Sequence, residues 1–153
     1  MSALMQIAYW TQKRLWKLLR PSTRGIKVML FNQAGEILLV RHSYGRRDLF
    51  VLPGGGVRPW EDPARAAHRE VREELGCACS GLLPISTHVT AAEGKRDTVF
   101  LFEAVLDGDP SPDGLELVEA RFFALEALPD SLSPATERRL AERSGIRQAD
   151  GRW

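Results

Sequence analysis

The chain has 153 residues, 44% of them hydrophobic, and a chain of this length buries roughly 70% of its surface on folding, so one domain needs no disulfide or structural metal. Its 21 basic and 20 acidic residues leave a net charge of +1, which argues against a broad nucleic-acid surface and favours a small-molecule partner. Cys77 and Cys79 are too few and too close for a disulfide framework, so we expect reduced thiols and a cytoplasmic location.

Residues 1–20 carry apolar side chains at helical spacing, with basic residues between them and no acidic residue. The pattern predicts an amphipathic basic helix that Pro21 ends. Three interpretations stay open: packing on the domain or on a dimer partner, contact with an anionic substrate or nucleic acid, and contact with a membrane surface. We favour packing or a homodimer contact. No apolar run approaches the roughly 20 residues that span a bilayer, so a membrane location is not expected.

The remainder of the chain reads as one domain over 21–147 with a tail over 148–153. Two short apolar stretches around a polar turn predict a hairpin (26–31 and 37–41), and a third strand over 50–52 leads into a run of glycines. Beyond residue 76, runs rich in apolar, β-branched and aromatic residues predict three more strands, and Ser133 can cap a closing helix (82–92, 98–106, 117–124 and 134–143).

Between these strands, residues 62–75 are mostly good helix formers. Glu61 or Asp62 can cap the first turn, and Pro63 suits an early helical position. Gly76 suits a left-handed stop. The sequence therefore predicts one well-delimited helix in the middle of the chain.

Three glutamates of this helix share one face within a single turn, because they lie three and four residues apart: Glu70, Glu73 and Glu74. Like charges placed so closely cost energy unless a cation lies beside them. The preceding run 53–56 contains three glycines, which allow close backbone approach and offer free carbonyls. Oxygen ligands of this kind suit Mg²⁺ or Mn²⁺, so we expect a divalent cation held by the carboxylates and by the carbonyl of Gly54 or Gly55.

The charged and glycine positions follow a fixed spacing: Gly55, Glu61, Arg69, Glu70, Val71, Glu73, Glu74 and Gly76. The stretch from Gly55 to Cys77 thereby resembles the complete signature of the Nudix hydrolases, the Nudix box. Its one departure is Cys77, a small apolar residue where the pattern has an aliphatic one. The resemblance implies an α/β fold, a Nudix-type α/β/α sandwich with a mixed β-sheet, to which the N-terminal amphipathic helix is added.

The same resemblance implies roles for single residues. Glu73 and Glu74 would be the principal Mg²⁺ ligands, and Glu70 a further ligand or the residue that positions the attacking water. We expect Arg69 to fix the rotamer of Glu73, and Glu61 to be structural. Many Nudix enzymes use one more carboxylate outside the box, and four residues are candidates here: Glu116, Glu119, Glu93 and Glu103. Glu116 is preferred, because the family often places an acidic residue just before the last strand.

Residues outside the box are the candidates for substrate binding. Arg41, Arg58 and the basic loop around residues 46–47 can bind phosphate, and Tyr44, Phe50 or Trp60 can stack on a base. Motifs typical of the ADP-ribose, diadenosine polyphosphate and coenzyme A branches of the family are absent, so the substrate stays open.

These expectations describe an Mg²⁺-dependent hydrolase in which water attacks phosphorus in a phosphoanhydride. The substrate would be a nucleoside diphosphate linked to another moiety, as in a nucleotide sugar, an ADP-ribose-like molecule or a nucleoside triphosphate. One alternative is a non-catalytic Nudix-fold nucleotide sensor, which would normally carry a broken box. Another is an isopentenyl diphosphate isomerase, which would need a dedicated catalytic cysteine and a larger chain.

Overall fold

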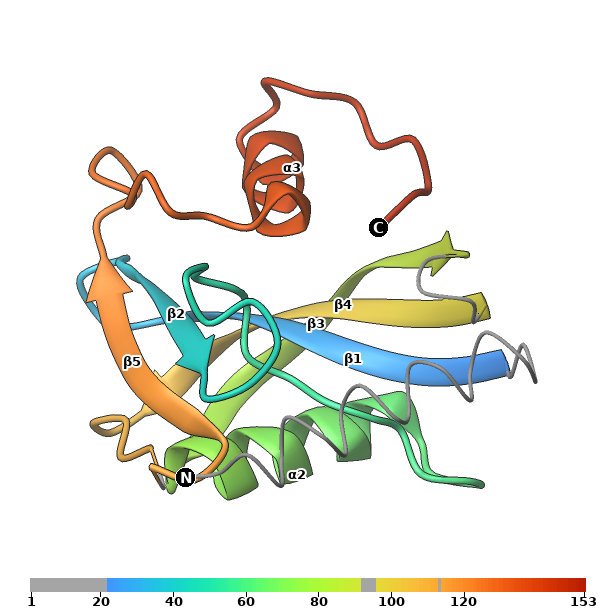
Figure 1. Ribbon diagram of the computed structural model, residues 1–153, viewed down its shortest axis with the longest axis horizontal. Coiled ribbons are helices and arrows are strands. Elements are labelled where there is room, and N and C mark those ends of the chain that lie inside the picture. Colours follow the sequence, from blue (N-terminus) through green and yellow to red (C-terminus); the bar gives the residue numbers. More distant parts are fainter. Residues whose placement is uncertain (1–21, 92–95, 113) are drawn as a thin grey trace.

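A mixed five-stranded sheet carries the fold, with strand order β3-β4-β1-β2-β5 (Figure 1). β1 (Ser22–Phe31) runs parallel to β4 (Arg96–Asp107) and antiparallel to β2 (Ile37–His42). The edge strands β3 (Ala78–Thr90) and β5 (Leu117–Phe123) are antiparallel to β4 and β2. The computed structural model describes residues 22–91, 96–112 and 114–153. The helix predicted over 1–20, and Glu93, lie outside these residues.

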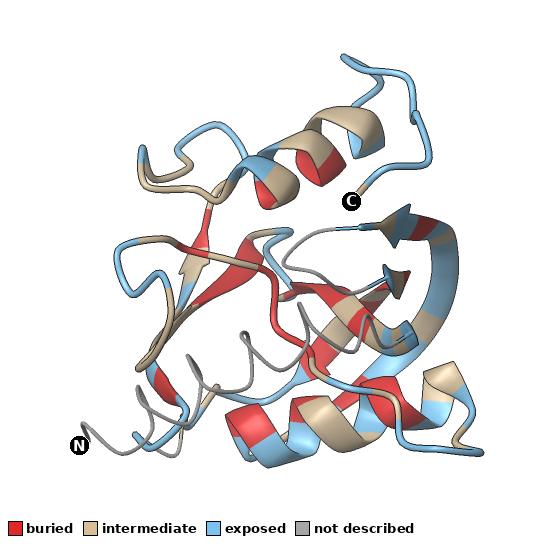
Figure 2. Ribbon diagram, turned by 45° about the vertical axis from the view of Figure 1, so that its right-hand side comes forward, coloured by how far each residue is buried: buried red, intermediate tan, exposed pale blue. Residues whose placement is uncertain are grey.

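Among the described residues, α2 (Pro63–Leu75) covers one face of the sheet and α3 (Pro134–Arg143) covers the other (Figure 1). Because side chains alternate along a strand, β1 supplies both cores. Ile26, Val28 and Leu30 belong to the cluster that contains the apolar side of α2, whereas Met29 and Phe31 pack with the cluster at α3. Figure 2 shows the buried residues gathered between the helices and the sheet. The predicted α/β/α sandwich with a mixed sheet is confirmed.

The bounds of both helices follow their capping residues. Asp62 is the N-cap of α2, accepting bonds from Ala64 N and Arg65 N, and Gly76 ends the helix at φ 69°. Ser133 caps α3 in the same way, accepting from Thr136 N at 3.2 Å. No helix within the described ranges is long and apolar enough to cross a membrane.

The strand predicted over 50–52 is wrong. Val51 exchanges both backbone hydrogen bonds with Val40, and Phe50 bonds to the backbone of residues 131 and 133, so these residues form isolated bridges to two partners. The bounds of β1 and β3 also differ from the prediction. β1 begins at Ser22 and β3 at Ala78, because their polar ends pair with the two ends of β4.

The glycine-rich loop lies along β1 and so joins the sheet to α2. Ile26 N donates to Gly55 O at 2.9 Å, and Val28 N donates to Pro53 O at 3.0 Å. Val57 N donates to Arg24 O at 2.9 Å. These bonds fix the loop between the sheet and the start of α2.

His42, at the end of β2, provides a test of this packing. Burial, together with the positive charge of Lys27, lowers the pKa of His42 from 6.5 to about 4. Folding is therefore favoured while the His42 ring is neutral. This contribution to the free energy of unfolding is complete above pH 6.5 and is lost as the pH falls toward 4, where the ring must be protonated. We expect wild-type protein to lose about 2–3 kcal/mol more unfolding free energy than His42→Gln between pH 7 and pH 4. Urea denaturation at several pH values measures this, and parallel pH profiles would contradict it.

Candidate functional site

The guanidinium of Arg69, on α2, holds three carboxylates. It donates to both oxygens of Glu61 at 2.8 and 2.9 Å, to Glu70 at 2.6 Å and to Glu73 at 3.0 Å. A fifth bond, 2.8 Å long, goes to the carbonyl of Gly56 in the glycine-rich loop. The Arg69 guanidinium therefore fixes the acidic face of the helix against the loop.

Glu61 ties the turn before α2 to this cluster. Besides the Arg69 bonds, it accepts a hydrogen bond from Arg58 N at 2.9 Å. The Arg69 and Arg58 bonds lower the pKa of Glu61 to about 2, so it is ionised at neutral pH. The Arg58 side chain lies 3.3 Å from Glu73, whose side chain is 52% exposed. Glu73 is thus the acid of the cluster that has most freedom to change partner.

Glu74 lies at the opposite, buried side of the acidic face. Only 6% of the residue is exposed, and its carboxylate accepts a bond from Gly54 N at 3.0 Å. Burial raises the pKa of Glu74 to about 7, although Lys27 and the Gly54 N–H oppose the shift. Burial likewise raises the pKa of Glu70. The site therefore holds acids whose charged forms gain from any added positive charge.

Lys27 lies under the glycine-rich loop and was not predicted from the sequence. Its ammonium donates to Leu52 O at 2.9 Å and contacts Gly54 O at 3.4 Å. Burial lowers its pKa, while the charges of Glu74 and Glu70 oppose that shift. A single charged residue inside the apolar run 26–31 was the available signal.

Gly55 leaves the space that the Glu70 carboxylate fills. A Cβ atom at Gly55 would lie 2.5 Å from Cδ of Glu70, a separation that real Cβ atoms do not show. At Gly56, in the same loop, an added Cβ would meet nothing within 4 Å. The close approach of loop and carboxylate thus depends on the first of these two glycines.

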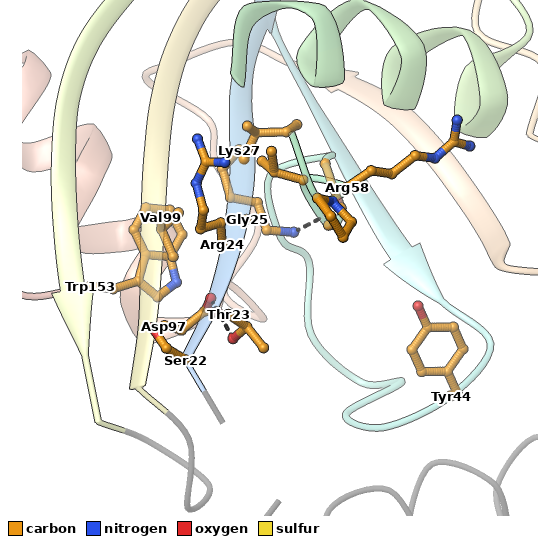
Figure 3. Close-up of a pocket in the computed structure, with 16 residues that line it drawn as sticks. Ser22, Thr23, Arg24, Gly25, Lys27, Tyr44, Arg58, Asp97, Val99 and Trp153 are labelled. Atoms are coloured by element: carbon orange, nitrogen blue, oxygen red, sulfur yellow. Dashed lines mark hydrogen bonds between the residues drawn. The ribbon is translucent and has the colours of Figure 1, made fainter. Parts of the chain in front are cut away.

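A cavity of about 740 Å³ opens beside the loop. It is lined by residues 54–59 of the loop, by 22–27 of β1, and by Tyr44, Asp97, Val99 and Trp153 (Figure 3). Pockets of this size hold ligands as large as a nucleotide. In Figure 3, Arg58 and Tyr44 lie on one side of the cavity, and Trp153 and Val99 on the other.

The structure divides the residues predicted to bind substrate. Tyr44 and Arg58 line the cavity. Arg41 instead forms a salt bridge with Glu119 and lies over the Phe50 ring, 5.3 Å from its centroid. Phe50 is 7% exposed and packs edge-on against Phe123, so it offers no open ring face.

Among the further acidic candidates, Glu116 is the one whose charge acts on glutamates of the box. Burial is the main cause of the raised pKa values of Glu70 and Glu74, and the charge of Glu116 adds a smaller contribution to both. Glu103 instead bonds to Arg143 of α3 at 2.7 Å. Of the candidates within the described residues, Glu116 therefore has an electrostatic coupling to the acidic face of α2.

The acidic face has the donor chemistry of a hard cation site. Carboxylate and carbonyl oxygens are the ligands that Mg²⁺ and Mn²⁺ prefer. In the part of the chain that the structure describes, no three acidic, His or Cys side chains form a ready-made metal site. Arg69 and Arg58 are bonded to Glu73 instead. The exposed side chain of Glu73 fits a cation that would take over part of this role.

A family model described as NUDIX domain matches residues 21–143. The chain belongs to the NUDIX family. Its fold is similar to the crystal structure of a MutT NUDIX hydrolase from Burkholderia pseudomallei, with a TM-score of 0.70 and 29% identity. That similarity covers 78% of this chain and 95% of the other.

Relatives within the family carry different names. An isopentenyl-diphosphate Delta-isomerase of Frankia alni is 36% identical over 125 residues, which cover 69% of this chain and 63% of the isomerase. A Bacillus subtilis protein named "Putative 8-oxo-dGTP diphosphatase" is 30% identical over 120 residues, 77% of each chain. The chain thus spans less than two thirds of the length of the isomerase.

Gly55 and Gly56, neighbours in the glycine-rich loop, give a matched test of the site's geometry. We expect Gly55→Ala to lower the unfolding free energy by about 1–3 kcal/mol, because the methyl group forces the Glu70 carboxylate and the Arg69 network to move. Gly56→Ala, which meets no atom, should change stability by less than about 0.5 kcal/mol. Urea denaturation of both variants checks this, and equal effects would contradict the close packing at Gly55.

Proposed function

We propose that this NUDIX protein is a divalent-cation-dependent pyrophosphohydrolase. Its substrate would be a nucleoside diphosphate linked to another moiety, and water would attack phosphorus. The observation that carries the proposal is the acidic face of α2, which Arg69 holds against a glycine-rich loop, and that loop lines a nucleotide-sized cavity. The family and the similarity to a MutT hydrolase point to the same chemistry.

Under this proposal, Glu70, Glu73 and Glu74 hold Mg²⁺ or Mn²⁺, with the carbonyl of Gly54 or Gly55 as a further ligand. When bound, the cation would neutralise charge that develops on the phosphate oxygens. Gly54 O has a weak 3.4 Å contact with Lys27, and Gly55 O accepts one bond from Ile26 N. Each carbonyl oxygen has a second lone pair and can accept another partner.

The chain's own residues would orient the reaction. Arg69 donates hydrogen bonds to Glu70 and Glu73 and so fixes their carboxylates, a positioning role. Arg58, exposed at the cavity wall, can bind a phosphate oxygen in place of Glu73. We propose Glu116 as the base that takes a proton from the attacking water, because it lies just before β5, where the resemblance places an acidic residue, and its charge acts on Glu70 and Glu74.

The similarity to an isopentenyl-diphosphate isomerase supports a second candidate activity. The surroundings of the two cysteines argue against this isomerase activity. Burial and nearby aspartates raise the pKa values of Cys77 and Cys79, and both pack with the core cluster at α2. Neither cysteine lines the large cavity.

Product release from a substrate panel tests the proposed activity. Nucleotide sugars, ADP-ribose and nucleoside triphosphates should yield a nucleoside monophosphate or phosphate with Mg²⁺, and none after EDTA treatment. Glu73→Gln should lower kcat at least about 100-fold, because a charged ligand of the cation that would neutralise the phosphate oxygens is lost. Full activity in this variant would contradict the mechanism. Rearrangement of isopentenyl diphosphate without phosphate release would support the isomerase instead.

The same assay separates Glu116 from its alternatives. Glu116→Gln should lower kcat about 100-fold with little change in KM, as expected for loss of a general base. Glu103→Gln is the matched control, because its carboxylate bonds to Arg143 on α3. If both variants keep wild-type kcat, the base lies elsewhere.

A further inference from the structure

The cavity lies on the face of the sheet that α3 covers. Thr23, Gly25 and Lys27 alternate along β1 with residues of the α2 core, so they point to this face. Across the strand pair, Asp97 lies opposite Thr23, and Val99 lies opposite Gly25. From Lys27 to Thr23 the strand extends roughly 13 Å, at about 3.3 Å per residue. This length suits a nucleoside with its phosphates directed to the glycine-rich loop.

Gly25 leaves the floor of this cavity open. A Cβ atom added there would come no closer than 3.5 Å to any atom, the carbonyl oxygen of Gly55. Protein packing therefore tolerates a side chain at this position. The absence of one keeps space free between Lys27 and Thr23, beside Val99.

The last residues of the chain close the far side of the cavity without forming a helix or strand. Gly151 O accepts a bond from Val89 N at 3.1 Å, which attaches the segment to β3. Arg138, on α3, donates to Trp153 O at 2.7 Å. Arg152 N bonds to Asp150 at 3.0 Å. The backbone that carries the Trp153 indole is thus bonded to two elements, β3 and α3.

A buried arginine supports the indole. Arg139 of α3 is 1% exposed, lies 5.5 Å from the centroid of the Trp153 ring, and donates to the carbonyl of Arg152. It also bonds to Glu142 at 2.6 Å and to His88 at 2.7 Å, and His88 meets the Trp153 ring edge-on. A buried ion pair adds little net stability, so its main effect here is to hold the segment in place.

The cavity end at Trp153 combines an aromatic wall with a hydrogen-bond acceptor. The indole and Val99 lie together in Figure 3, with Asp97 and Thr23 beside them. Thr23 donates to one oxygen of Asp97 at 2.9 Å. A carboxylate oriented in this way accepts hydrogen bonds from N–H groups, and an indole stacks on a flat heteroaromatic ring. An amino-bearing nucleobase has both features.

We propose that Trp153 is the stacking platform for the nucleobase of the substrate, and that Asp97 accepts a hydrogen bond from its exocyclic amino group. The direction of the phosphates toward the loop rests on the proposed hydrolase function. Base binding does not require hydrolysis, and it can be measured separately. Arg139 is a positioning residue, which acts by holding the indole.

Titration calorimetry with GMP and IMP in the presence of EDTA tests the subsite without catalysis. GMP and IMP differ by one amino group, so GMP should bind about five times more tightly than IMP. Trp153→Ala should weaken GMP binding about tenfold, because base stacking is lost, and Trp153→Phe should restore most of it. Trp60→Ala is the matched control, since Trp60 is fully exposed and does not line the cavity. Asp97→Ala should remove the preference for GMP over IMP.

Gly25→Val provides a second variant that does not disturb the segment around Trp153. The added side chain should fill the floor of the cavity and weaken GMP binding at least tenfold in a protein that stays folded by circular dichroism. Ribose 5-phosphate that binds wild-type protein as tightly as GMP, or unchanged GMP binding in Trp153→Ala and Gly25→Val, would overturn the subsite. Normal nucleotide binding without turnover of any substrate would leave the subsite intact and refute the hydrolase function.

Discussion

The site depends on one cation, the guanidinium of Arg69, which holds Glu61, Glu70 and Glu73 in a single network. Without it, the acids of α2 would repel one another within one helical turn. Its bond to Gly56 O also joins the helix to the glycine-rich loop. The loop is in turn bonded to β1, so the position of every proposed ligand follows from the packing of α2 on the sheet.

β1 lies between the acidic face of α2 and the cavity on the α3 side of the sheet. One set of its side chains packs toward α2, beneath the acidic face, whereas Lys27 and Thr23 point to the cavity on the α3 side. The glycine-rich loop runs alongside β1, bonded to its backbone, and leads to the start of α2. Under the two proposals, the phosphates and the nucleobase of the substrate would lie at opposite ends of one cavity.

Much of the fold could be predicted from the sequence, because its signals are local. The cap at Asp62, the stop at Gly76 and the apolar alternation of β1 define elements by short-range chemistry. The box also predicted its acids correctly as neighbours on one helix face. The placement of Phe50 in the core, the bridges of residues 50–51 and the docking of Trp153 depend on distant partners. Lys27 was missed because its role arises only when the loop folds over β1.

Anomalous diffraction from crystals soaked in Mn²⁺ most directly tests whether the Arg69 network is a cation site. The account predicts a peak within bonding distance of the Glu70, Glu73 and Glu74 carboxylates and of the Gly54 or Gly55 carbonyl. Glu73 should then have exchanged a bond to Arg69 or Arg58 for the cation. A peak bound by other residues, or no peak while Arg69 keeps all its bonds to the acids, would contradict it.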